Sequence, residues 1–211
     1  TDSDGVNDYQ EIVSLGTNPV NSDTDSDGMP DGWEYQNGLS CLVDDSASDP
    51  DGDLLENYDE YMENTDPNDS DTENDGMPDG WEVTYNLDPN SDLDVYSDPD
   101  SEGVLNIYEY RNGTNPRDAD TDDDGLDDLE EIETYLSDPT LFDTEGDGMP
   151  DGWEIQYGFL YLTDDSKEDP DNDTVLNVYE YGNGTNPLLN DTDLDFMPDW
   201  WEIENNLLPC D

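Results

Sequence analysis

The spacing of the acidic residues is the feature that most constrains how this chain can fold. Nine times along the sequence, acidic side chains recur at positions 1, 3, 5, 9 and 12 of a twelve-residue window, and the clearest copy is DTDSDGMPDGWE at residues 23–34. In the calcium-loop pattern D-x-D-x-D-G-x5-E, short acids wrap the ion from one side and a bidentate glutamate completes its oxygen shell. The spacing therefore predicts an array of calcium loops whose fold depends on the ions.

Composition gives the same dependence a physical reason. The formal charge is -59 over 211 residues, and only 30% of the residues are hydrophobic. Such a chain repels itself and buries too little apolar surface to offset its ordering entropy, so we expect disorder without counter-ions. A solvated acidic tail and a halophilic surface are the alternatives, but neither explains why glycine, carboxylates and aromatic residues keep fixed offsets.

The windows keep one phase through the chain. Eight are complete, and each closes with a glutamate eleven residues after its first aspartate. A single copy is a moderate signal, whereas eight in phase are a strong one. The windows are predicted at residues 23–34, 49–60, 71–82, 98–109, 120–131, 143–154, 169–180 and 191–202, with an incomplete first loop near 1–11.

We predict that side chains at positions 1, 3, 5, 9 and 12 and the backbone carbonyl of the apolar position 7 bind the ions. In the first five windows these are Asp2, Asp4, Asp8, Glu11, Asp23, Asp25, Asp27, Met29, Asp31, Glu34, Asp49, Asp51, Asp53, Leu55, Asn57, Glu60, Asp71, Glu73, Asp75, Met77, Asp79, Glu82, Asp98, Asp100, Glu102, Val104, Asn106 and Glu109. In the last four they are Asp120, Asp122, Asp124, Leu126, Asp128, Glu131, Asp143, Glu145, Asp147, Met149, Asp151, Glu154, Asp169, Asp171, Asp173, Val175, Asn177, Glu180, Asp191, Asp193, Asp195, Met197, Asp199 and Glu202.

Some windows depart from the pattern. Position 6 is usually a glycine that supplies a sharp turn, but Leu54, Thr174 and Phe196 stand there in three windows, for which we expect altered turns. Asparagine replaces the acid at position 9 in three windows, two of which also lack the glycine, and this lowers the charge of those loops; these residues are Asn57, Asn106 and Asn177.

Calcium fits the predicted ligands better than other ions do. Magnesium prefers a small octahedral shell that keeps its waters, and these loops offer too many carboxylates for it. Zinc and iron are poorly served by a chain with no histidine and two isolated cysteines. About nine calcium ions are predicted, and they would neutralise less than a third of the formal charge, so further ions are expected at acids outside the windows, such as Asp44, Asp45, Asp164 and Asp165.

A short helix of one or two turns is predicted to leave each loop, because an apolar residue follows each closing glutamate. Proline at position 8, as in Pro30, suits a helix start, where a missing N–H costs little. Gly-Thr-Asn-Pro at Gly16 and Gly184 and Asn-Thr-Asp-Pro at Asn64 are stop signals. We expect tryptophan at position 11 to pack on the adjacent unit, because one unit cannot bury its aromatic residues alone.

A longer period of 120 residues lies above the short one, since Asp23, Asp49 and Asp71 recur as Asp143, Asp169 and Asp191. No linker or change in composition divides the chain. The predicted fold class is therefore a repeat protein with little regular secondary structure, in which tandem EF-hand-like calcium loops, each followed by a short helix, form a single elongated, calcium-cored solenoid or rod over residues 1–211.

The strings DTDSDGMPDGWE, DPDGDLLENYDEY and GTNP resemble bacterial and archaeal thrombospondin type 3 repeats over essentially the whole chain. The resemblance implies an extracellular calcium-binding rod in which ions often take ligands from adjoining repeats. The paired cysteines of the animal repeats are absent. Each loop with its helix also resembles the half EF-hand of dockerins, but those use two such loops, whereas a run of nine favours a scaffold.

The first and last residues suggest a head-to-tail assembly. The first window lacks its position-1 aspartate, and Asp211 placed before Thr1 would restore DTDSDG, so one subunit could complete the first loop of the next. The alternative is that the chain is a segment cut from a longer polypeptide. Cys41 and Cys210 lie at nearly equivalent places in the repeat, and they are either buried free thiols or, as oxidising surroundings favour, links between neighbouring subunits.

The function classes follow from these features. The leading prediction is an extracellular or cell-surface structural protein, a calcium-rigidified stalk or a self-associating filament subunit. The alternative is a calcium-stiffened spacer or adhesion module of a larger secreted protein, with cell-surface or matrix proteins as partners. Three cationic residues exclude a phosphate-tracking groove and hence nucleic acid, and no apolar run is long enough for a membrane span. An enzyme is not expected, because there is no histidine and the acids are already assigned to ions.

Overall fold

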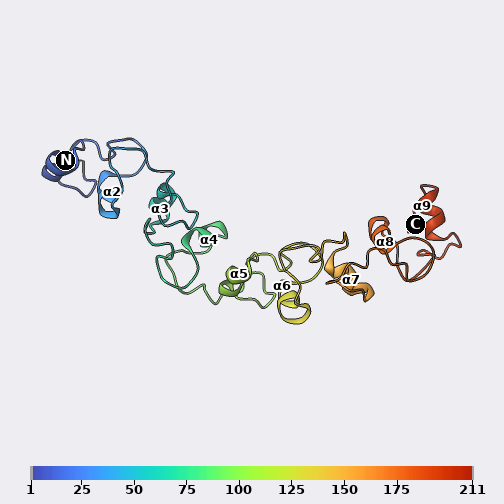
Figure 1. The fold of residues 1–211 in the computed structure, drawn as a ribbon. Coiled ribbons are helices and arrows are strands. Elements are labelled where there is room, and N and C mark those ends of the chain that lie inside the picture. The colour runs from blue at the N-terminus through green and yellow to red at the C-terminus, as the bar shows by residue number, and fades with distance from the viewer. Residues whose placement is uncertain (1, 211) are drawn as a thin grey trace. The chain divides into compact units, whose positions relative to one another are not determined.

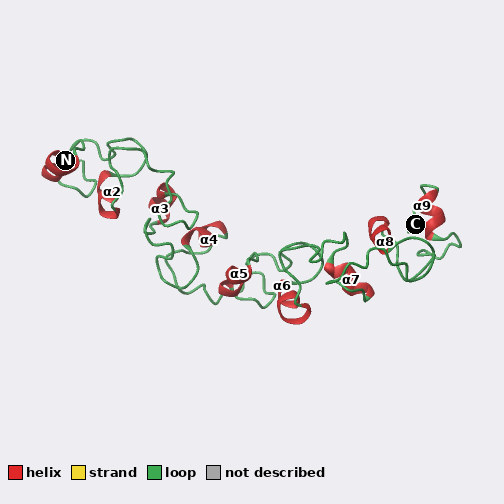
Figure 2. Cartoon of the chain, in the orientation of Figure 1, coloured by secondary structure: helices red, strands yellow, loops and turns green. Residues whose placement is uncertain are grey.

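The computed structural model describes residues 2–210, and loops make up most of it (Figure 2). No β-strand occurs in this part of the chain. Short helices follow one another along it, separated by loops (Figure 1). Their bounds are α1 Asp8–Gln10, η1 Glu11–Leu15, α2 Asp31–Asn37, α3 Asn57–Glu63, α4 Asp79–Thr84, α5 Asn106–Asn112, α6 Asp128–Glu130, η2 Glu131–Tyr135, α7 Asp151–Tyr157, α8 Asn177–Asn183 and α9 Asp199–Glu204.

Contacts divide the chain into two compact units. The first contains residues 2–97 and 105–110, and the second contains residues 98–104 and 111–210. The windows up to residue 82 lie in the first unit, and those from residue 120 onward lie in the second. The window that begins at Asp98 contributes residues to both units.

Each α-helix begins at position 9 of its window, and η1 and η2 continue α1 and α6 from the closing glutamate. The closing glutamate therefore lies within the helical segment and not before it. The residue before the helix is extended, as at Pro30 with φ -73° and ψ 139°, and proline suits this place because it has no N–H to leave unpaired. The predicted stop signals are confirmed at Gly16, Asn64 and Gly184, which end their helices with φ of 83°, 66° and 77°.

All nine windows make the same turn, including those without glycine at position 6. The backbone at position 6 has positive φ throughout, from 98° to 112° at the glycines and 78°, 84° and 79° at Leu54, Thr174 and Phe196. The expectation of altered turns in these three windows was therefore wrong. A bulky residue in this region costs energy, so the surrounding loop must enforce the conformation.

Aromatic pairs join successive windows, as predicted for tryptophan at position 11. Trp33 meets Tyr61 edge-on with ring centroids 5.3 Å apart, and Trp81 meets Tyr110 in the same way at 5.5 Å. In the second unit, Trp153 contacts Tyr181 at 5.6 Å. Each tyrosine directly follows the closing glutamate of the next window, so the prediction is confirmed at these three tryptophans.

The apolar core is small. Its one cluster of buried side chains in the first unit contains Met77, Val95 and Ile107, against which Trp81 and Tyr110 pack. Across the described residues, more carboxylates than hydrophobic side chains are buried. Apolar burial of this extent is too small to hold a protein of this length without another source of stability.

Glycine at position 10 lets one window approach the backbone of the window before it. A Cβ atom built on Gly80 would lie 2.4 Å from the carbonyl oxygen of Asp53, and one on Gly152 would lie 2.5 Å from that of Asp124. The N–H groups of the same glycines donate to the Asp53 and Asp124 carboxylates at 2.8 and 3.0 Å. These close approaches are possible only for glycine.

We predict that Gly80→Ala destabilises the first unit by about 1–3 kcal/mol, because its methyl group overlaps a backbone oxygen that cannot move away alone. The measurement is chemical unfolding in saturating calcium. Gly182→Ala is the matched control: Gly182 lies inside α8 with no atom within 4 Å of its Cβ position, so it should be neutral or slightly stabilising. Equal stability of the two variants would contradict the packing described for Gly80.

Candidate metal centres

The closing glutamates are among the most deeply buried charged side chains of the described residues. All nine have at most 2% of their surface exposed, and they are Glu11, Glu34, Glu60, Glu82, Glu109, Glu131, Glu154, Glu180 and Glu202. Both carboxylate oxygens of Glu11, Glu34, Glu82 and Glu154 are buried without a hydrogen-bond donor. A buried carboxylate in this state costs several kcal/mol unless a cation compensates it.

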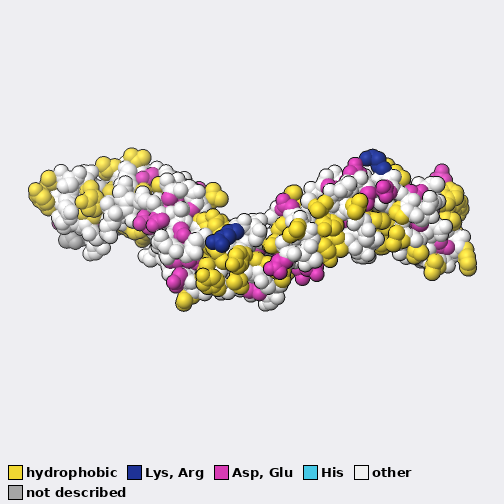
Figure 3. All heavy atoms as spheres, turned by 60° about the horizontal axis from the view of Figure 1, so that its bottom comes forward, with side chains coloured by type: hydrophobic (Ala, Val, Ile, Leu, Met, Phe, Trp, Pro, Cys, Tyr) yellow, Lys and Arg dark blue, Asp and Glu magenta, His cyan; other side chains and the backbone are white. Residues whose placement is uncertain are grey.

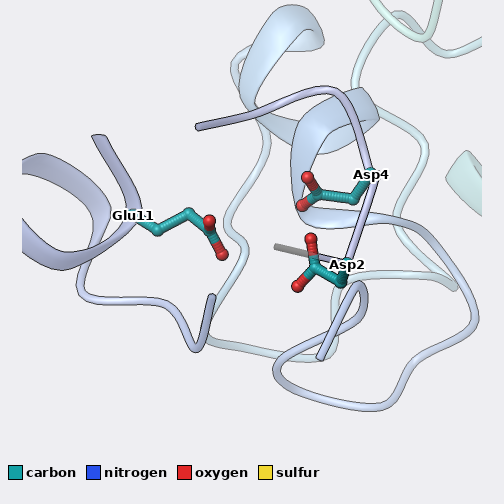
Figure 4. Close-up of side chains that lie close together, drawn as sticks. All are labelled: Asp2, Asp4 and Glu11. Carbon is teal, nitrogen blue, oxygen red and sulfur yellow. The ribbon is translucent and has the colours of Figure 1, made fainter. Parts of the chain in front are cut away.

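One group of carboxylates forms inside each of the first three windows. In the first window, Asp2 and Asp4 lie on the loop and Glu11 at the start of η1, and their carboxylates converge on a common space (Figure 4). Asp23, Asp25 and Asp27 form such a group in the next window, and Asp49, Asp51 and Asp53 in the third. The predicted ligands at positions 1, 3 and 5 are thus brought together in these windows.

The groups are compact enough for one metal ion. One oxygen atom from each residue lies within 4.8 Å of the others. Calcium–oxygen bonds are about 2.4 Å long, so oxygens up to about 4.8 Å apart can bind the same calcium ion. Eleven further groups of this kind occur among the described residues.

Hydrogen bonds from the backbone hold each loop in this shape. The two oxygens of Asp23 accept from the N–H groups of Ser26 and Gly28 at 2.6 and 3.0 Å, and Asp27 accepts from the Met29 N–H at 2.9 Å. Asp71 and Asp143 make equivalent bonds at their own windows. In the folded chain, backbone N–H groups therefore fix the orientation of the carboxylates at positions 1 and 5.

A second group of carboxylates forms where one window meets the next. Asp53 and Glu60, at positions 5 and 12 of one window, lie with Asp79 from position 9 of the following window, and all three are buried. The backbone bond from Gly152 to Asp124 shows that the same junction recurs in the second unit. Position 9 was predicted as a ligand within its own loop, but Asp79 is placed among the acids of the preceding loop.

Three windows complete this second group differently, with an aspartate from the connecting segment. Asp27, Glu34 and Asp45 lie together, and the Asp45 N–H donates to Asp27 at 3.4 Å. Asp165 is bound to Asp147 in the same way at 3.1 Å. Asp45 and Asp165 each keep one buried oxygen without a donor, as does Asp94. Their neighbours Asp44 and Asp164 accept instead from serine hydroxyls.

Of the four acids outside the windows that the sequence indicates as possible ion ligands, the structure places two with the other carboxylates and two apart from them. Asp45 and Asp165 join the clusters, whereas Asp44 and Asp164 do not, and Asp94 was not predicted at all. The signal for all three is simple, since each lies four residues before the first aspartate of a window. Asparagine at position 9 does not leave these junctions short of charge, because the connecting aspartate supplies it.

The residue at position 2 decides how position 9 is held. In the five complete windows where position 2 is threonine, its N–H donates to the position-9 aspartate, and in four of these windows its hydroxyl does too, as from Thr72 to Asp79 at 3.0 and 2.7 Å. Where position 2 is proline, as at Pro50, there is no N–H to donate. Position 9 is then asparagine, and the Asn57 Nδ2 donates to the Asp45 carbonyl at 2.9 Å while its buried Oδ1 keeps no donor.

A hydroxyl after the helix donates to the closing glutamate in three windows. The hydroxyls of Thr65 and Thr185 donate to Glu60 and Glu180, and the Ser137 hydroxyl donates to Glu131 at 2.9 Å. In these windows the threonine or serine of the stop signal therefore holds the glutamate in place. The bond occupies one carboxylate oxygen and leaves the other for an ion.

Burial makes the ionised form of these glutamates unfavourable when no cation is bound. Burial, together with the neighbouring aspartates, raises the pKa of Glu34, Glu60 and Glu131 from the usual 4.5 to about 8 each. Burial and the Glu73 carboxylate likewise raise the pKa of Glu82. A divalent cation would reverse these shifts because it favours the ionised form.

Some predicted ligands stay outside these groups or outside the described residues. Asp211, predicted to complete the first loop of a neighbouring subunit, lies outside the described residues. Coordination by the position-7 carbonyls stays a prediction. Their side chains are buried in most windows, with Met29, Met77 and Met149 fully so.

The two cysteines differ in environment. Cys41 is 6% exposed and its thiol donates to the Asp31 carbonyl at 3.3 Å, whereas Cys210 is exposed and its thiol donates to the Gly184 carbonyl at 3.1 Å. A link between subunits is therefore disfavoured at Cys41, because the thiol would first have to leave its buried place.

Comparison with known proteins identifies no relative. No protein-family model matches the chain, and no match was found among the curated proteins or the solved structures. The resemblance to thrombospondin type 3 repeats therefore stays a prediction that depends on the residues of the windows themselves.

The adjacent residues Asp44 and Asp45 allow a test of the carboxylate group formed by Asp27, Glu34 and Asp45. We predict that Asp45→Asn lowers the affinity of the protein for calcium at one site by about tenfold or more, since it removes a ligand charge from a buried cluster. The measurement is isothermal titration calorimetry. Asp44→Asn, which removes the same charge one residue earlier, should leave every site unchanged; a matching loss in both variants would show a general charge effect.

The raised glutamate pKa values predict an unusual pH dependence. Without ions, the folded chain binds more protons than the unfolded chain between the usual pKa of 4.5 and the folded value of about 8. The free energy of unfolding should therefore fall as pH rises through this interval, and calcium should reverse the trend because it displaces those protons. Thermal unfolding in chelator and in calcium, from pH 5 to pH 8, measures both slopes; a metal-free melting temperature that rises with pH contradicts the assignment.

Proposed function

We propose that this chain is an extracellular calcium-binding structural protein, in which bound ions take the place of an apolar core. The observation that carries the proposal is the burial of nine closing glutamates in a chain with only three lysines and arginines. Such carboxylates are stable in a folded protein only with cations beside them. Calcium suits an all-oxygen site that has a flexible shell and several carboxylates.

The distribution of the groups favours a structural role over catalysis. They recur along the described residues, both inside windows and where windows meet. The position-5 acids Asp27 and Asp53 belong to both kinds of group, so each would bind two ions. Removal of the ions should therefore disrupt both the loops and the packing of one window on the next.

Low-affinity calcium binding suits the outside of a cell. Extracellular modules bind calcium with dissociation constants of about 0.1–1 mM. At tenfold excess, each site then contributes roughly 1.4 kcal/mol of stability. About nine sites would contribute on the order of 12 kcal/mol, which is comparable to the stability of a whole domain.

The proposed architecture is an array of the thrombospondin type 3 kind that serves as a calcium-rigidified stalk or as a filament subunit. None of the described helices is long or apolar enough to span a bilayer. The partners proposed are other copies of the chain or proteins of the cell surface or matrix. Association with nucleic acid is disfavoured by the formal charge of -59.

We predict that a chelator unfolds the chain at neutral pH and that calcium restores the fold. Circular dichroism and small-angle X-ray scattering at about 150 mM salt measure the loss of helix and of compactness. The same experiment with magnesium in place of calcium should restore little, since magnesium is reluctant to lose its waters. A chain that keeps its melting temperature after chelation would refute the proposal.

Sedimentation velocity then separates the two structural roles. A filament subunit should grow in size when calcium is added, whereas a stalk or spacer should stay monomeric while it becomes compact. Both outcomes keep the calcium-dependent fold, so the test of assembly does not depend on the test of the ions.

A further inference from the structure

The last window carries a tryptophan where the related windows carry glycine. Position 10 is Gly32, Gly80 and Gly152 in the other windows that have tryptophan at position 11, but it is Trp200 here. The Trp200 N–H still donates to Asp173 in the preceding window, at 3.3 Å compared with 2.8 Å for the equivalent Gly80. The junction therefore keeps its hydrogen bond but accommodates a large side chain where, at Gly80 and Gly152, backbone atoms leave no room for one.

Two cavities lie beside Trp200. One is about 300 Å³ and the other about 470 Å³, and both are lined in part by Trp200 and Thr174. The smaller cavity also has Tyr179 and Glu204 in its wall. Both aromatic side chains are available to a ligand, because Trp200 is 39% and Tyr179 61% exposed. Apolar lining comes from Val175 and Ile203.

Tyr179, Trp200 and Glu204 of the smaller cavity differ from the copy of the repeat that lies 120 residues earlier. The residues 120 positions earlier are Asp59 for Tyr179, Gly80 for Trp200 and Thr84 for Glu204. Neither aromatic ring nor the carboxylate is needed to build the junction, since the earlier copy lacks all three. Glu204 also lies beyond the closing glutamate, so its charge is not assigned to an ion.

Two aromatic faces and a carboxylate together recognise a cation. The electron-rich face of tryptophan attracts ammonium and guanidinium groups, and tyrosine does so less strongly. No lysine or arginine is among the described residues that line the smaller cavity, so no cationic side chain in its wall competes for the Glu204 carboxylate. The excess of acids over the whole chain attracts basic partners and repels anionic ones. Hydrophobic side chains reach the surface on the face shown in Figure 3, where lysine and arginine are sparse.

We propose that the cavity between Tyr179 and Trp200 binds a lysine or arginine side chain from a basic segment of a partner protein, with Glu204 as its counter-charge. This site lies outside the calcium groups and adds a binding function to the structural one. The partner is defined by its chemistry, an exposed basic segment.

The test uses the full chain in about 10 mM calcium and 150 mM salt, with calorimetric titration of the peptide Gly-Lys-Gly-Lys-Gly-Lys-Gly. A peptide with serine in place of lysine and a neutral oligosaccharide are the comparison ligands. The lysine peptide should bind and the other two should not. Binding of the oligosaccharide or the serine peptide in place of the lysine peptide would overturn the proposal.

The variants separate a cation site from a merely apolar or acidic surface. Trp200→Leu should weaken lysine-peptide binding about tenfold, whereas Trp200→Phe, which keeps an aromatic face, should lose less. Equal losses would mean that the surface is only apolar. Circular dichroism in calcium checks that both variants keep the fold, and Tyr96→Leu, at a tyrosine that is 74% exposed in the first unit, should not change binding.

Glu204→Thr restores the threonine of the earlier copy and should also weaken binding. Its matched control is Glu133→Thr, because Glu133 is exposed and lies two residues after a closing glutamate, as Glu204 does. A loss of the same size in both variants would show that the peptide responds only to the net charge of the chain, and the proposal would then fail.

Discussion

The attraction between a divalent cation and buried carboxylates is the interaction on which the proposed fold depends. Each closing glutamate has almost no exposed surface, and several have no hydrogen-bond donor for either carboxylate oxygen. In most proteins such burial would be prohibitive, because the desolvation of a charge exceeds what packing returns. Here the same glutamate lies beside acids from its own loop and from the next, so one ion would satisfy several of them at once.

Several features of the folded chain hold the carboxylates in place for an ion. Loop backbone N–H groups orient the carboxylates at positions 1 and 5, a threonine or serine hydroxyl steadies the glutamate, and the positive φ at position 6 is kept even where leucine, threonine or phenylalanine must adopt it. The edge-on contacts between tryptophan and tyrosine then join one window to the next. Apolar packing therefore sets the register between windows, while the carboxylate clusters occupy their interiors.

Departures from the repeat point to compensation in one place and to added function in another. Asparagine at position 9 occurs together with proline at position 2 and with an aspartate in the preceding connector, so the charge at the junction is kept by a different residue. Trp200 has no such compensation: it leaves cavities beside it and an exposed aromatic face. A change that the structure balances is typical of the scaffold, and one that it leaves exposed is a candidate for recognition.

The sequence by itself determined the positions of the loops, the helix ends at Gly16, Asn64 and Gly184 and the packing of tryptophan on an adjacent window, because these depend on fixed short spacings and on local backbone preferences. Sequence reasoning also named the acids within each window. Only the tertiary structure decided that the helices begin at position 9, that Asp79 joins the preceding loop, and that Asp45 rather than Asp44 joins a cluster. The physical reason is that a ligand set shared between windows depends on how the windows pack, and neighbouring aspartates are indistinguishable until the backbone turns one of them inward.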